Sequence, residues 1–280
     1  MGGLMLELKM MTKIDFRGIC KGIAQGLMKS SPVQATRWQS INAPQPMLEL
    51  LNYSILLNLS GVEDLDFYRS ELIPNLPWAD HHFEDERVSG DPINPGKTWR
   101  EWPYSHSANT HRREGEEDPQ FDHSYAERYW PKAAGTTPTG ILESDCIQVR
   151  QGIRFPYGDL DDLVTVLASE PTTRQAYLPV WFPEDLGAAL QGKRVPCSLG
   201  YHFICRGNEL HMVYYLRSCD FVRHFRDDVY LSIRLLLWVL DQCRWASPSN
   251  GWDEVKPGTF TMHITSLHCF QSDQVVLKNV

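Results

Sequence analysis

Residues 195–228 read VPCSLGYHFICRGNELHMVYYLRSCDFVRHFRDD, and this stretch predicts the central structure of the chain. Two runs of alternating apolar residues flank the dipeptide Gly207-Asn208, a pattern typical of a β-hairpin with a two-residue turn. The hairpin brings Cys197, at the start of one strand, near Arg217, at the end of the other. A thiol nucleophile and an anion-binding guanidinium held on rigid strands are suited to attack on a phosphorylated substrate.

The composition narrows the class of protein. The chain has 280 residues, of which 42% are hydrophobic, enough for one large domain. The formal net charge of −8 argues against broad binding to nucleic-acid backbones, so local arginines have to hold any anionic substrate. The seven cysteines are irregularly spaced and form no CxxC pair, which favours reduced thiols. Because no apolar run is long enough to span a membrane, we expect a soluble, cytoplasmic protein.

Four segments have the apolar pattern of helices. Residues 13–29 and 159–170 carry apolar side chains at helical spacing, which predicts amphipathic helices. Residues 229–245 are apolar nearly all round, as expected of a core helix. Residues 46–60 are also apolar on most faces, begin at a proline and end before a glycine, so they predict a further buried helix.

Strands are predicted on both sides of the hairpin. Residues 174–182 favour a strand that carries Pro179 at an edge or a bulge. Residues 260–270 alternate, which predicts one strand face formed by Met262, Ile264, Ser266, His268 and Phe270. No linker or internal repeat divides the chain. We therefore expect a single α+β domain over residues 1–280, with a mixed or antiparallel sheet packed by helices.

The polar stretch over residues 80–145 is predicted to be a long loop region that serves a site. It contains histidines 81, 82, 106, 111 and 123. These side chains are either solvated or metal ligands. Their spacing matches no established zinc pattern, so we expect no metal site.

Several residues of the chain together resemble thymidylate synthase. Cys197 in a VPC context precedes the run 217–220, which reads RSCD, and His268 lies in a late strand. Further matches are Thr173-Arg174 before Trp181, and Trp78-Ala79-Asp80 followed by Gly96-Lys97-Thr98-Trp99-Arg100. The resemblance covers roughly residues 45–270. It implies a thymidylate synthase-like domain with an N-terminal helical extension over residues 1–44. It also implies a homodimer that forms through the sheet and shares its active sites.

The resemblance also implies a reaction and the residues that perform it. Cys197 adds to C6 of a pyrimidine nucleotide, which makes C5 able to attack a one-carbon unit carried by 5,10-methylene-tetrahydrofolate. The implied binding residues are Arg217 and Ser218 on the 5′-phosphate, Arg174 from the partner subunit on the same phosphate, His268 on the sugar 3′-hydroxyl, and Asp220 on the pterin. Trp78 and Asn75 align with two tryptophans that cover the folate site.

Asp228 stands where thymidylate synthases carry an asparagine that reads uracil. Asparagine offers a donor and an acceptor that match uracil O4 and N3–H. A carboxyl group instead complements cytosine, which presents a 4-amino donor and an N3 acceptor. The segment 225–228 also resembles deoxycytidylate hydroxymethylase. The alternative is that Asp228 caps a helix beginning at Val229, a role that Asp227 could fill instead.

Other departures bear on the reaction. Asn75, polar where the family has a tryptophan, could admit water to the methylene intermediate and so give hydroxymethylation. Phe270 removes a hydroxyl from the sugar pocket. Glu49 is the nearest candidate for the family's general acid/base glutamate, and the alternative is a solvated or helix-end carboxylate. The sequence given continues only briefly past Phe270, so the resemblance leaves open how a folate site is closed.

The sequence thus predicts an enzyme that adds a one-carbon unit to C5 of deoxycytidylate, leaving hydroxymethyl. A methylated product, a ribonucleotide substrate and thymidylate synthesis are the alternatives at the same site. An alternative of another class is a catalytically inactive nucleotide- or RNA-binding relative. The resemblance further implies a bacteriophage role in making precursors of modified DNA.

Overall fold

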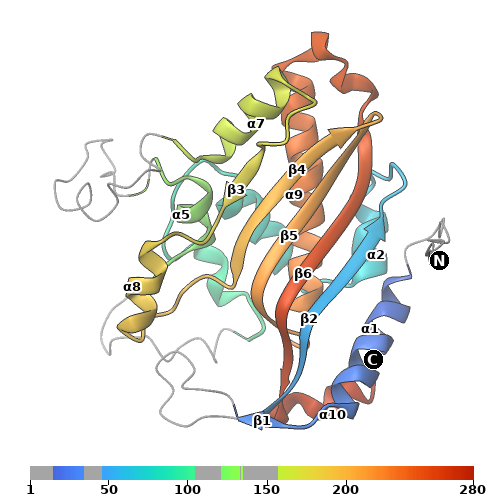
Figure 1. Ribbon diagram of the computed structural model, residues 1–280, viewed down its shortest axis with the longest axis vertical. Helices are drawn as coiled ribbons and strands as arrows, with labels where there is room; N and C mark the ends of the chain where they lie inside the picture. The colour runs from blue at the N-terminus through green and yellow to red at the C-terminus, as the bar shows by residue number, and fades with distance from the viewer. Residues whose placement is uncertain (1–14, 35–45, 105–120, 133, 135–156) are drawn as a thin grey trace, which may run out of the picture.

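A six-stranded sheet forms the centre of the computed structural model, which describes residues 15–34, 46–104, 121–132, 134 and 157–280 (Figure 1). The strands are β1 (Val33–Gln34), β2 (Pro46–Asn58), β3 (Tyr177–Pro179), β4 (Ser198–Arg206), β5 (Glu209–Asp220) and β6 (Lys256–Phe270). Their order is β1-β2-β6-β5-β4-β3, and only β5 and β6 run parallel. The predicted α+β architecture with a mixed sheet is confirmed.

The long helix α9 (Phe225–Ala246) connects β5 to β6 and lies behind the sheet in Figure 1. Such a crossover is needed because two parallel neighbours cannot be joined by a tight turn. The other helices are α1 (Phe16–Lys29), α2 (Leu65–Leu72), α3 (Trp78–His81), α5 (Tyr125–Tyr129), α7 (Leu160–Ser169), α8 (Glu184–Leu190) and α10 (Gln274–Leu277). The predicted core helix is confirmed as α9, although it begins at Phe225 and not at Val229.

The central hairpin and two amphipathic helices form as predicted. Gly207 and Asn208 both have positive φ, at 56° and 62°, as a two-residue hairpin turn requires. Helix α1 buries Phe16, Cys20, Ile23, Ala24 and Leu27. Helix α7 packs against α9 through its buried leucines. The strand expected over 174–182 is confirmed only as the short β3.

The prediction of a buried helix over residues 46–60 is wrong, because this segment forms strand β2. It pairs with β6 from Met47↔Phe270 to Asn58↔Thr259. Buried Ile55 and Leu57 face the helices, whereas Leu56 between them is 47% exposed on the opposite face. A strand with apolar residues on both faces has the same composition as a helix that is apolar all round, so periodicity could not separate the two.

The face predicted for the strand 260–270 is only partly correct. Met262 and Ile264 are buried on one face, but beyond them Leu267 and Cys269 take the inward positions. Strand β6 thus changes which residues face inward after Ile264. Strand β4 also has a register irregularity, between Ser198 and Gly200. The irregularities bend the strand ends next to Cys197 and therefore redirect the side chains there.

Residues 80–145 are not simply a long loop in their described part. The π-helix η1 (His82–Arg87), the 3-10 helix η2 (Lys97–Arg100) and α5 all lie there. Buried Glu86, Arg87 and Glu127 hold these short elements together through hydrogen bonds. Histidines 106 and 111 lie outside the described residues.

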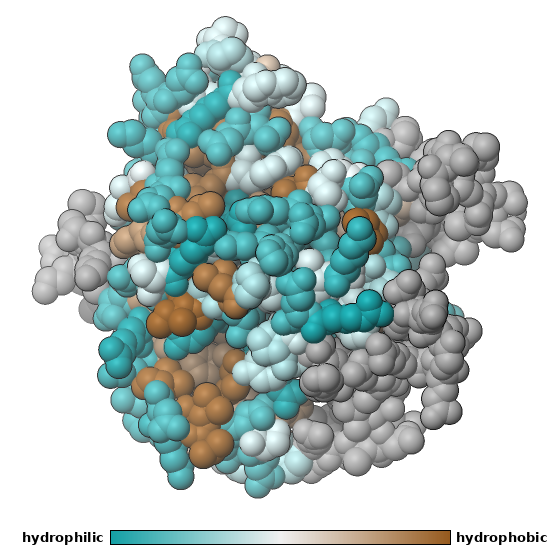
Figure 2. Space-filling view, turned by 180° about the vertical axis from the view of Figure 1, so that it is seen from behind, coloured by the Kyte–Doolittle hydropathy of each residue, from teal (hydrophilic) through white to brown (hydrophobic). Residues whose placement is uncertain are grey.

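Helices cover one face of the sheet. Figure 2 views the molecule from this helical side and shows hydrophilic residues interrupted by hydrophobic patches. The other face of the sheet carries apolar side chains that are partly open to solvent, including Leu56 at 47% and Tyr177 at 43% exposure. Buried polar groups lie where β4 begins and where β5 and β6 end, and Cys197 lies in this region.

Candidate active site

Cys197 and Arg217 lie side by side, as the hairpin predicts. Cys197 immediately precedes β4, and its carbonyl accepts the backbone N–H of Arg217 at 2.9 Å. The Arg217 guanidinium donates to the carbonyls of Pro196 and Val195 at 2.8 and 3.0 Å, and its Nη2 lies 3.9 Å from the Cys197 Sγ. Burial raises the pKa of the half-buried Cys197 thiol, while Arg217 opposes that shift by stabilising the thiolate.

Arg194 is a second cation at Cys197 that the sequence reading missed. Its backbone N–H donates to Asp122 at 2.7 Å, which fixes the segment leading into Cys197. The guanidinium acts on the Cys197 thiol and lowers its pKa, in the same direction as Arg217. Arg194 directly precedes the run Val195-Pro196-Cys197, and this position in the sequence was the available signal for its role.

Three hydroxyl groups form a chain next to Cys197. Ser198, the residue after the thiol, donates from Oγ to the Tyr125 hydroxyl at 3.0 Å and also shares a short hydrogen bond with the Tyr214 hydroxyl. Burial raises the pKa of both tyrosines, so their hydroxyls stay protonated at neutral pH. Tyr125 belongs to α5, far from Cys197 in sequence, and was not predicted to contribute.

Asp228 faces the same region from the first turns of α9. Its Oδ2 accepts a weak hydrogen bond from Cys219 Sγ at 3.5 Å. Burial raises the pKa of Asp228 to about 7, opposed most strongly by the positive charge of Arg87. Its carboxyl in turn raises the pKa of Cys197. The structure therefore brings together the nucleophile and the acid that the sequence singled out.

The first turn of α9 shows that neither aspartate is the helix cap. The N-cap residue is His224, and Asp228 donates its own N–H to the His224 carbonyl at 2.8 Å. Asp227 instead accepts the Asn75 backbone N–H at 2.8 Å and its side-chain amide at 2.7 Å. The capping alternative is therefore wrong for both aspartates, and Asp227 fixes Asn75 beside Asp228.

Three predicted ligand residues meet where β5 and β6 end. Ser218 Oγ lies 3.5 Å from His268 Nδ1, and Asp220 accepts the backbone N–H groups of Val222 and Arg223 at 3.0 and 3.2 Å. Burial lowers the pKa of His268 and raises that of Asp220. A neutral imidazole can accept and donate hydrogen bonds, as recognition of a sugar hydroxyl requires.

Glu49 lies at a different edge of this region from Cys197. It pairs with His268 across β2 and β6, and it accepts a short hydrogen bond from Ser266 Oγ. Its charge raises the pKa of His268. No described contact joins Glu49 to Cys197, so the geometry gives no direct support to its expected acid/base role.

Trp78 lies in a stack of aromatic rings at the edge of the site. Its ring stacks on His82 with centroids 5.0 Å apart, and it contacts Trp102, which stacks on His224 at 4.6 Å. The indole N–H groups of Trp78 and Trp102 are buried and have no hydrogen-bond partner among the described residues. The stacked rings form a flat aromatic cluster at this edge of the site.

Arg174 lies far from Cys197 of its own chain. It precedes the edge strand β3, its side chain is exposed, and its carbonyl accepts a hydrogen bond from His202 at 3.0 Å. His202 is in the middle of β4, several residues beyond Cys197. A role for Arg174 at a substrate phosphate therefore needs a second subunit.

Gly96 makes room for the buried carboxylate of Glu86. Replacing Gly96 with alanine would put a Cβ 1.8 Å from Glu86 Cδ, which Thr98 holds through two hydrogen bonds. We expect G96A to lower the free energy of unfolding by about 1–3 kcal/mol, measured by urea denaturation. The control is G22A, at an exposed position of α1 where an added Cβ meets nothing within 4 Å. This substitution should raise the free energy of unfolding by about 0.5–1 kcal/mol. Equal effects of the two substitutions would contradict this account.

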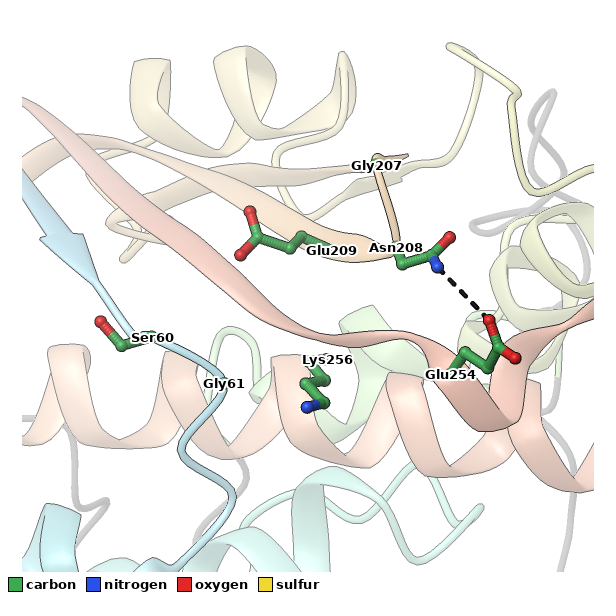
Figure 3. Close-up of a pocket in the computed structure, with 7 residues that line it drawn as sticks. All are labelled: Ser60, Gly61, Gly207, Asn208, Glu209, Glu254 and Lys256. Atoms are coloured by element: carbon green, nitrogen blue, oxygen red, sulfur yellow. Dashed lines mark hydrogen bonds between the residues drawn. The ribbon is translucent and has the colours of Figure 1, made fainter.

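A separate surface pocket of about 340 Å³ lies at the other end of the hairpin (Figure 3). Its lining residues are Ser60, Gly61, Gly207, Asn208, Glu209, Glu254 and Lys256. The hairpin turn is separated from Cys197 by the length of β4, roughly 30 Å at about 3.3 Å per residue. The pocket therefore does not belong to the site around Cys197.

Among the described residues, no group of three or more His, Cys, Asp and Glu side chains is arranged to hold a metal ion. In the same part of the chain, no helix has the length and apolar character needed to cross a membrane.

Comparisons with known proteins agree with the resemblance of this chain to thymidylate synthase. No family model matches the chain. A protein of Methanosarcina barkeri (strain Fusaro) named "Putative thymidylate synthase" is 26% identical over 133 residues, which are 46% of this chain and 55% of that protein. The match thus spans only about half of that relative's length.

The fold was compared with solved structures. Thermostable thymidylate synthase A from Bacillus subtilis matches with a TM-score of 0.54 and 14% identity, over 94% of this chain and 83% of that one. The chain therefore has a thymidylate synthase-like fold, and part of its sequence is similar to a protein named for that family.

Proposed function

We propose that this chain is a one-carbon transferase of the thymidylate synthase family that hydroxymethylates C5 of deoxycytidylate. The observation that carries the proposal is the convergence of Cys197, which immediately precedes β4, with Arg217 of β5 and Asp228 of α9. The thymidylate synthase-like fold and the partial sequence match support the reaction class. Asp228 supports cytosine as the base, because a carboxyl group complements the N3 and 4-amino edge.

The residues present account for the steps of addition. Arg217 and Arg194 favour the Cys197 thiolate, which adds to C6 and sends an electron pair towards C5. Protonated Asp228 gives its proton to N3 and stabilises the resulting adduct. C5 then bonds to the methylene carbon of 5,10-methylene-tetrahydrofolate. After loss of the C5 proton, the bond from that carbon to the folate nitrogen breaks, which releases tetrahydrofolate and leaves an exocyclic methylene. Water adds to this methylene, and expulsion of the Cys197 thiolate with return of the N3 proton to Asp228 leaves hydroxymethyl-deoxycytidylate.

The proposal also assigns binding roles to the remaining residues. Arg217 and Ser218 bind the 5′-phosphate and neutral His268 binds the sugar hydroxyl. Trp78 contacts the pterin, with Asp220 and Asn75 at the same end of the site.

We further propose a homodimer formed through the open face of the sheet. Partly exposed Leu56 and Tyr177 on that face favour burial against a second copy. Arg174, exposed beside Tyr177 and remote from its own Cys197, is then free to reach the phosphate in the other subunit's site.

The products of one assay test this function. The full chain is incubated with methylene-tetrahydrofolate and deoxycytidylate, deoxyuridylate or cytidylate, and the nucleotides are analysed by mass spectrometry. We expect deoxycytidylate to gain one carbon and one oxygen, because water completes the reaction. A gain of one carbon without oxygen indicates methylation. Nucleotide binding without conversion of any of the three would show a non-catalytic relative.

A further inference from the structure

Arg87 is a buried cation with an unusual environment. It ends the π-helix η1 and is only 4% exposed. Its Nε donates to His82 Nε2 at 3.0 Å and its Nη1 to the Tyr129 hydroxyl at 3.4 Å. Within the described parts of the chain, no carboxylate forms an ion pair with it. A buried guanidinium without such a partner is costly, which indicates that its charge is used nearby.

A chain of hydrogen bonds fixes the position of this cation. Because Arg87 has no acceptor, His82 Nε2 must be the acceptor of their bond, and its proton is then on Nδ1. That Nδ1–H donates to Glu86 Oε2 at 2.7 Å. Glu86 is held in turn by the Thr98 N–H at 2.7 Å and hydroxyl at 2.8 Å. Burial lowers the pKa of His82, so the imidazole stays neutral in this arrangement.

The cation faces the wall of the site that carries the hydroxyl chain. The Arg87 guanidinium carbon lies 4.4 Å from the centre of the Tyr125 ring, whose hydroxyl accepts from Ser198 beside Cys197. Titratable groups on several neighbouring elements interact electrostatically with Asp228. They are Arg87 from η1, Tyr125 from α5, Cys197 before β4, Tyr214, Cys219 and Asp220 from β5, and Asp227 from α9 itself. Arg87 is the positive charge in this set.

We propose that Arg87, anchored through His82 and Glu86, is a positioning residue that controls the protonation of Asp228 and thereby the choice of base. The proposal rests on the function assigned to Asp228 above. Burial raises the pKa of Asp228, and the positive charge of Arg87 opposes this rise. A carboxyl that exchanges its proton near neutral pH can both donate to cytosine N3 and recover the proton afterwards.

The test measures the titration of Asp228 directly, in the full chain without substrate. Carboxyl ¹³C NMR with labelled aspartate follows the pH midpoint of the Asp228 titration. The signal that disappears in D228N is the one that belongs to Asp228. R87M removes the charge at similar length, and it should raise the midpoint by at least about one pH unit. R87K keeps the charge and should restore a midpoint close to that of the unchanged chain. A folded R87M with an unchanged midpoint overturns the proposal.

A second variant covers the case in which R87M fails to fold. H82L keeps Arg87 but removes both hydrogen bonds of the imidazole, to Arg87 and to Glu86, and it should move the Asp228 midpoint upward by less than R87M. An unchanged midpoint in folded H82L would likewise reject the proposal. The preference for binding deoxycytidylate over deoxyuridylate should change with pH around the measured midpoint in each variant. If the midpoint moves while that preference does not, base selection by Arg87 is wrong.

Loss of the proposed function and loss of the role of Arg87 give different results. If the unchanged chain converts no nucleotide, the proposed function fails, yet the NMR midpoints still report whether Arg87 controls Asp228. If it converts deoxycytidylate but the midpoints coincide, only the role of Arg87 fails.

Discussion

Replacing Cys197 with alanine should lower turnover of deoxycytidylate by at least about a thousandfold. Removal of a covalent nucleophile leaves only binding and electrostatic stabilisation, and losses of this size or larger are typical. The same variant should lose exchange of the C5 proton with solvent in the presence of methylene-tetrahydrofolate. Exchange requires addition at C6, and Cys197 is the thiol that Arg217 and Arg194 activate.

The matched control is C205A. Cys205 is a buried thiol in β4, the strand that follows Cys197, but it lies at the hairpin end, where it pairs with Leu210. C205A should therefore keep exchange and turnover while it remains folded, as measured by circular dichroism. If C197A retains exchange at the level of C205A, Cys197 is not the nucleophile.

Replacing Asp228 with asparagine should shift the preference from deoxycytidylate towards deoxyuridylate by at least about a hundredfold in the ratio of kcat/KM values. Asparagine has a permanent donor and acceptor, so it pairs with uracil O4 and N3–H but meets cytosine N3 without a proton to transfer. A buried site that leaves a polar group unpaired discriminates strongly against the mismatched base. The ratio is measured by competition between the two nucleotides.

D227N is the control for this specificity change. Asp227 is adjacent, buried and acidic, but it binds Asn75 and not the base in our account. D227N should reduce activity by loosening Asn75 while leaving the base preference intact. Equal shifts in preference for both variants would mean that loss of negative charge, and not hydrogen-bond complementarity, decides the base.

The central hairpin and the approach of Cys197 to Arg217 followed from the sequence alone. Positive φ at Gly207 and Asn208 fixes the turn, and the turn fixes the register of the strands, so both ends are determined locally. The sequence alone also predicted that Asp228 changes the recognition of the base, because a carboxyl group has other hydrogen-bonding groups than the asparagine of the family. Helices α1 and α7 were recognisable because each buries apolar side chains at helical spacing.

Only the tertiary structure decided the rest. Segment 46–58 is a strand because β6 supplies its backbone hydrogen bonds, and no local pattern distinguishes a two-sided apolar strand from a buried helix. Tyr125 and Arg87 reach the site from segments distant in the chain, so spacing in sequence gave no signal for them. The sequence determined which groups are candidates for reaction, and packing determined the charges that surround them, because electrostatic effects depend on distance and burial in three dimensions.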